Sequence, residues 1–146
     1  MTSLTLTAAQ TILSTVLDHS RKGNFKPMGV VVLDARGAVK AAAIEDGNSL
    51  KRFEIAHGKA HGALSLGIGS RSIFKRAKEQ PYFVASATHI ANGALIPVPG
   101  GVLIRAGAGG EVIGAVGVSG DTSDNDEAAA LAGIAAAGLV GDPGAD

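Results

Sequence analysis

The amino-acid sequence predicts an α+β domain in which helices pack on an antiparallel sheet. Runs of β-type residues occur in hairpin-like groups separated by glycine-containing turns, at 28–45 and 95–118. Segments with apolar residues at helical spacing precede, separate and follow these groups. Hairpin connections produce antiparallel strands, so we expect one antiparallel sheet with the helices covering it.

Length and composition exclude several classes of protein. The 146 residues suit one domain over 1–146, and 13 basic residues balance 13 acidic ones, so neither nucleic acid nor an anionic membrane is an expected partner. The absence of cysteine excludes disulfides, thiolate metal sites and a cysteine nucleophile. We see no signal-peptide pattern and no apolar run long enough to cross a bilayer, which predicts a cytoplasmic protein.

The element order follows from apolar spacing and turn residues. In chain order we expect a helix from residue 6, strands 28–34 and 38–45, helices 50–66, 71–78 and 81–92, strands 95–98, 102–105 and 112–118, and a helix 124–139. Thr7, Ser49 and Ser123 are the expected N-caps of the first, second and last helices. Residues 141–146 are expected to form a flexible tail.

The positions of glycine and alanine lead to two further predictions. The turn Pro99-Gly100-Gly101 should need a positive φ at one of its glycines. Gly58 and Gly62 inside the second helix allow another backbone to approach closely, and the last helix has small residues on several faces. These features predict a closed homo-oligomer, although an alanine-rich surface helix is the alternative.

The second helix contains the richest group of chemical side chains. Glu54, His57 and His61 are spaced three and four residues apart and therefore share one face. Two histidines and a carboxylate can bind a divalent metal, so His57 and His61 are candidate metal ligands. The alternatives are a small-ligand or tetrapyrrole site and an ordinary polar stripe on an amphipathic helix.

Three other segments could bind or convert a ligand. The turn containing Ser119 and Gly120 leads into a helix N-terminus that could bind an anion, unless the nearby aspartates make it self-capping. The turn Pro99-Gly100-Gly101 is a candidate ligand-binding loop, and His89, shortly before it, is a candidate proton-handling group or a surface residue. The basic segment 71–78 is either a solvated helix or a site for carboxylates of a ligand.

The sequence also resembles a known family. PVPGGVLI and GEVIGAVGVSGDTSDNDE resemble the C-terminal half of the GlcG/HbpS family, which includes the C-terminal domain of PduO-type proteins. MGVVVLDARGAVKAAAIEDG and FEIAHGKAHGAL resemble its first hairpin and second helix. This likeness, from about residue 4 to residue 139, implies a profilin-like, five-stranded antiparallel sheet, often assembled into homo-oligomers.

The resemblance also implies a function. It suggests a small-ligand or tetrapyrrole-binding protein, with haem or a corrinoid as ligand, and it matches Lys59 more firmly than His57 or His61. One alternative is an enzyme on the same scaffold that acts on a small organic acid in a catabolic pathway, with Lys59 and His89 in catalytic roles. Another is a non-catalytic assembly protein. Family likeness alone does not determine a reaction.

Overall fold

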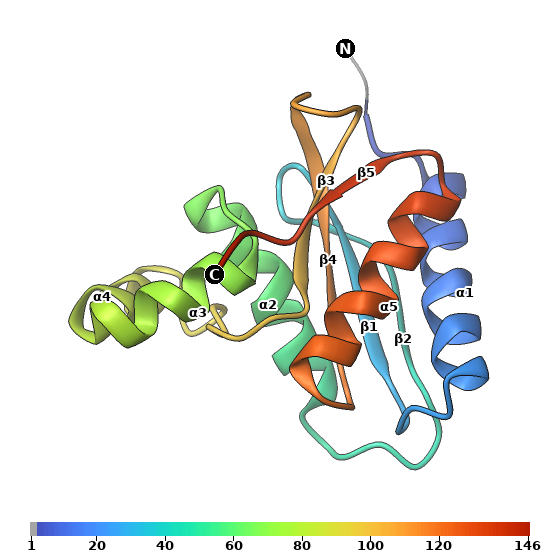
Figure 1. The fold of residues 1–146 in the computed structure, drawn as a ribbon, viewed down its shortest axis with the longest axis horizontal. Coiled ribbons are helices and arrows are strands. Elements are labelled where there is room, and N and C mark those ends of the chain that lie inside the picture. Colours follow the sequence, from blue (N-terminus) through green and yellow to red (C-terminus); the bar gives the residue numbers. More distant parts are fainter. Residues whose placement is uncertain (1–2) are drawn as a thin grey trace.

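The computed structural model describes residues 3–146 and has five helices and a five-stranded antiparallel sheet in that range (Figure 1). The strand order is β2-β1-β4-β3-β5, and the α+β prediction is confirmed. The elements are α1 (Leu6–Lys22), β1 (Gly29–Asp34), β2 (Val39–Ile44), α2 (Arg52–Leu66), α3 (Ser70–Glu79), α4 (Pro81–Ile90), β3 (Gly101–Arg105), β4 (Val112–Ser119), α5 (Ser123–Ala136) and β5 (Val140–Asp142). No helix within 3–146 is long and apolar enough to span a membrane.

Helices cover both faces of the sheet. α1 and α5 pack on one face, where Val30 and Val32 of β1 belong to the larger core. α2 packs on the other face, against Val31 and Leu33 of the same strand. Since alternate residues of a strand point to opposite faces, burial on both sides explains why β1 is apolar throughout.

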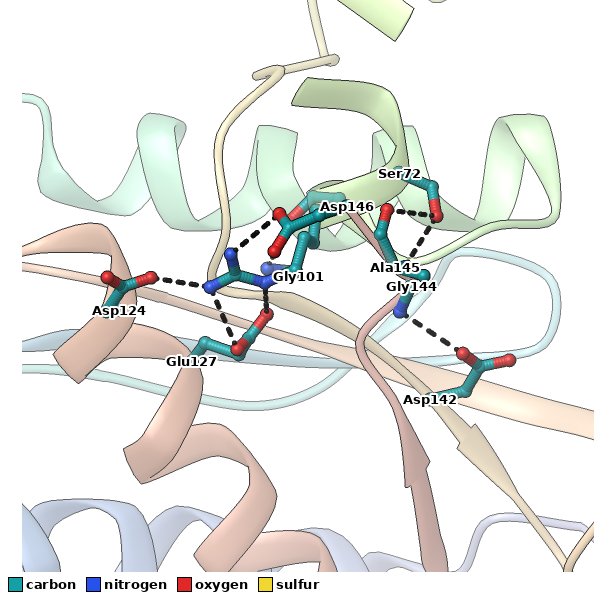
Figure 2. Close-up of polar contacts among 10 residues, drawn as sticks. Ser72, Gly101, Asp124, Glu127, Asp142, Gly144, Ala145 and Asp146 are labelled. Atoms are coloured by element: carbon teal, nitrogen blue, oxygen red, sulfur yellow. Dashed lines mark hydrogen bonds and ion pairs between the residues drawn. The ribbon is translucent and has the colours of Figure 1, made fainter. Parts of the chain in front are cut away.

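One predicted strand is wrong, and one strand was not predicted. Residues 95–98 are not a strand: Pro97 and Pro99 lack the N–H group that a ladder requires, and Ile96 N donates to Gly58 O at 3.1 Å instead. The fifth strand is β5, which pairs with β3 and includes the first two residues of the segment expected to be flexible. The structure also differs beyond β5, because Ala145 N donates to Ser72 Oγ at 2.8 Å (Figure 2).

The three predicted N-caps are also wrong by small displacements. Thr5 caps α1, accepting from Ala8 N at 3.1 Å, and Thr122 caps α5, accepting from Asn125 N at 3.2 Å. α2 begins at Arg52 without a side-chain cap, and Ser49 Oγ accepts from the Arg52 side chain instead. At α1 and α5 the predicted and observed caps are neighbouring hydroxyl residues, and local sequence does not decide which of them begins the helix.

Glycines allow α2 to lie directly against the rest of the chain. A Cβ atom on Gly117 of β4 would stand only 1.8 Å from Ala56 O. A Cβ on Gly58 would stand 2.6 Å from Ile96 Cγ1, and one on Gly62 would stand 2.9 Å from Leu95 Cγ. The close approach expected at Gly58 and Gly62 is therefore made by this chain's own segment.

A buried ion pair connects the helices on opposite faces of the sheet. Lys59 Nζ of α2 lies 3.0 Å from an Asp126 carboxylate oxygen of α5, and both side chains are almost inaccessible to solvent. The ammonium group also donates to Val118 O at 2.9 Å, and the second Asp126 oxygen accepts from Asp121 N at 3.0 Å. Burial lowers the pKa of Lys59 and raises that of Asp126, since desolvation disfavours both charged forms.

The glycine turn between 97 and 101 provides a first test. Gly100 has φ +120°, which confirms the expected positive φ, and a Cβ on Gly101 would stand 2.3 Å from Lys59 O. We expect Gly100→Val and Gly101→Val each to lower the free energy of unfolding by about 1–3 kcal/mol, through backbone strain and overpacking respectively. Urea unfolding measures this. Gly107→Ala is the control, because a Cβ there meets nothing within 4 Å; unchanged stability in both valine variants would contradict the assignment.

The ion pair provides a second test. Lys59→Met leaves Asp126 buried and unpaired, so we expect it to lower the free energy of unfolding by about 3–5 kcal/mol, and Asp126→Leu to act similarly. The double variant should recover most of that loss, since it leaves no unpaired charge. Urea unfolding of all four proteins gives the coupling free energy. If the losses of unfolding free energy in the two single variants add up to the loss in the double variant, the coupling free energy is zero and the two side chains do not stabilise each other.

Candidate functional site

The most suitable ligand site is a pocket between α2 and α4. Its volume of about 600 Å³ is in the range of small-molecule sites. The wall is largely apolar with a few polar side chains, and the lining residues are His61, Ser65, Leu66, Phe83, Ser86, Ala87, Ile90, Ala91, Asn92 and Ala94. An apolar wall with few polar groups suits a ligand with a large apolar body.

Local sequence places α4 where it can form one wall. α3 and α4 extend away from the sheet as an arm (Figure 1), and Pro81 at the start of α4 redirects the chain directly after α3. After α4, Asn92 and Gly93 adopt positive φ and reverse the chain toward α2. The arm has only a small core of its own, formed by Ile73, Val84, Ala87 and Leu95.

His61 is the titratable residue in the pocket wall. Its Nδ1 lies 2.8 Å from the carbonyl oxygen of Ala94. A carbonyl can only accept, so Nδ1 carries a proton, and whenever the ring is neutral the lone pair is on Nε2. A histidine whose other nitrogen donates to a carbonyl has the arrangement typical of metal-ligating histidines.

His57 extends this group along α2. Its ring stacks between those of Phe53 and His61, with centroid distances of 5.8 and 5.4 Å. Burial, and secondarily electrostatic repulsion between the two imidazoles, lowers the pKa of His57 and so favours its neutral form. His57 therefore stacks on the ring of His61 but does not itself line the pocket.

The expected three-ligand metal site is not assembled. Glu54 is exposed and pairs with Lys51 at 3.3 Å, whereas the two histidine rings stack on each other. Across residues 3–146, no group of three or more His, Cys, Asp or Glu side chains could hold a metal ion. His57 and His61 alone remain of the predicted set.

The two residues proposed as catalytic lie in different surroundings. Lys59 is only 2% exposed and its ammonium group is held by Asp126 and Val118 O, so it does not face a solvent-accessible site. His89 is exposed in the last turn of α4 and does not line the pocket. The structure therefore gives these two side chains no shared site.

The predicted turn Pro99-Gly100-Gly101 and the N-terminus of α5, which together we call the frame, are outside the pocket wall. Pro99 and Gly100 are buried, and Gly101 N donates to Ser70 Oγ at 2.7 Å. Ser119 Oγ accepts from Arg52 at 2.8 Å, and Gly120 packs closely on Pro27 O. These groups already have protein partners and do not line the pocket.

The start of α5 is self-capped, as one of the two alternatives expected. Thr122 caps the helix, and Asp126 accepts from Asp121 N. Hydrogen bonds from Lys26 N, the Asn125 side chain and Thr122 N lower the pKa of Asp121 to about 2, so this carboxylate is charged. A negative charge at this position opposes binding of an anion at the helix N-terminus.

Sequence reasoning missed most of the pocket wall. Phe83, Ala87 and Ile90 have helical spacing, which indicates one apolar face of a helix but not what covers that face. The partner of Asp126, Lys59, is 67 residues away in sequence. Neither relation has a local sequence signal.

Comparisons with known proteins agree with this fold. Three similar solved structures are Klebsiella pneumoniae protein ORFY (26% identity, TM-score 0.83, covering 94% of this chain and 93% of that one), HbpS (27%, 0.78, 92% and 90%) and a PduOC:heme complex (20%, 0.83, 94% and 97%). The last supports the fold alone. A search of curated proteins found no match. The family model described as "Haem degrading protein HbpS-like" matches residues 4–135, and the chain therefore belongs to the HbpS-like family.

Proposed function

We propose that this protein binds haem or a related tetrapyrrole in the pocket between α2 and α4. The single observation that carries the proposal is a largely apolar cavity of about 600 Å³ with one histidine in its wall. The description of the family as haem-degrading supports the same ligand. A corrinoid would need the same kind of site, since it too is a large macrocycle that contains a metal.

His61 is the residue that would hold the metal of the macrocycle. The hydrogen bond from Nδ1 to Ala94 O fixes the ring orientation and leaves the Nε2 lone pair for iron. The bound macrocycle would supply the iron chemistry, while this chain's apolar residues Leu66, Phe83 and Ile90 would exclude water from its faces. The placement of Lys59 and His89 does not favour the alternative enzyme for small organic acids.

Titration with haemin tests this proposal. We expect the wild type to shift the Soret band at micromolar concentration, and His61→Ala to weaken binding on the order of 10- to 100-fold, because the metal ligand is lost. His89→Ala is the matched control on the exposed surface of α4 and should bind as the wild type does. No Soret shift by the wild type would refute haem binding, and equal binding by His61→Ala would refute this ligand.

We also propose that the chain forms a homo-oligomer, through a surface different from the one the sequence suggested. Gly58, Gly62 and Gly133 contact this chain's own residues, so they give no evidence for a partner. Large apolar side chains are instead exposed on edge strand β2 and at the start of α2, where Leu50 is 89% exposed. The other exposed residues of this apolar surface are Val39, Ile44 and Phe53.

Light scattering in solution tests this assembly. A wild-type mass above that of one chain is expected, and Leu50→Glu should lower it, because a charge would be buried at the contact. Ala136→Glu places the same charge on the exposed side of α5 and is the matched control. A single-chain mass that does not change with concentration would contradict assembly, and a lower mass only for Ala136→Glu would move the interface to α5.

A further inference from the structure

The pocket wall contains no formally charged side chain, but a cation stacks on one of its residues. The lining residues include polar groups and His61 but no Lys, Arg, Asp or Glu. The guanidinium carbon of Arg76 lies 4.2 Å from the ring centroid of Phe83, which lines the pocket. The positive charge of Arg76 therefore lies against an aromatic ring that is itself part of the pocket wall.

The hydrogen-bonding capacity of Arg76 is largely unused. Its Nε donates to Gln80 Oε1 at 2.9 Å, and within residues 3–146 Arg76 makes no other side-chain hydrogen bond and no ion pair. Both terminal nitrogens therefore remain available as donors. The stacking on Phe83 holds the planar group in place, which reduces the entropy that a ligand contact would cost.

The neighbouring basic residues of α3 are less suitable. The guanidinium of Arg71 donates hydrogen bonds to three carboxylates, those of Asp124, Glu127 and Asp146 (labelled in Figure 2). Lys78 lies over Phe74, which is not part of the pocket wall. Arg76 therefore combines free donors with a contact to the wall.

We propose that Arg76 binds a carboxylate at the edge of the ligand and makes the pocket selective for planar apolar molecules that carry one. A guanidinium with two free nitrogens suits a carboxylate, which it can bind through two parallel hydrogen bonds. The same side chain positions Phe83 against the apolar body of the ligand. This inference rests on the proposed function of the pocket and adds the class of substituent that the ligand must carry.

A comparison of haemin with haemin dimethyl ester tests the contact, since the ester keeps the macrocycle and blocks both carboxylates. We expect Arg76→Gln to weaken haemin binding about tenfold and to change ester binding less than about twofold. Arg76→Lys should lie between Arg76→Gln and the wild type, because it keeps the charge but loses the fork. Lys75→Gln, a change of exposed charge on the same helix, is the control and should affect neither ligand.

The outcomes separate this inference from the proposed function. Equal weakening of haemin and ester by Arg76→Gln would overturn the carboxylate contact and leave only a role in holding Phe83. If the wild type binds neither macrocycle, the proposed function fails. A thermal-shift titration with succinate then tests whether Arg76 binds a carboxylate. A shift present in the wild type and lost in Arg76→Gln would support a carboxylate site for a small acid, whereas no shift in either would overturn it.

Discussion

The buried pair of Lys59 and Asp126 is the interaction on which the arrangement of the layers depends. It joins α2 to α5, although these helices cover opposite faces of the sheet. Two charges removed from water contribute little net stability, but a missing partner is costly, so the pair requires one arrangement of the two helices. Val118 O and Asp121 N complete the hydrogen bonds of the pair at the end of β4.

Close backbone packing around this pair explains the glycine-rich sequence. Side chains at Gly101 and Gly117 would overlap the α2 backbone, and Gly100 adopts a conformation that other residues rarely adopt. These residues are therefore needed for helix α2 to approach the sheet closely enough for Lys59 to reach Asp126. Most of the motifs that carry the family resemblance thus form the frame, whereas the pocket lies between α2 and the arm, and the α2 motif FEIAHGKAHGAL contributes His61 to its wall.

The separation of frame and pocket has a functional consequence. The frame has its polar groups paired with protein partners, so it has little capacity left for a ligand. The pocket has an apolar wall, the Nε2 lone pair of His61 and the free terminal nitrogens of Arg76. One helix, α2, connects the two regions, because Lys59 and His61 lie two residues apart and point to different surroundings.

The sequence by itself determined the fold class, the β1–β2 hairpin, the approximate helices and the positive φ in the turn before β3, because these depend on spacing and on residues within a few positions. Only the tertiary structure decided that Val140–Asp142 supplies the fifth strand and that residues 95–98 do not. A three-residue strand has too few residues for a periodic pattern, so its partner defines it. The pairing of Lys59 with Asp126 and the pocket beside His61 likewise depend on residues far apart in sequence, and no local pattern encodes their contact.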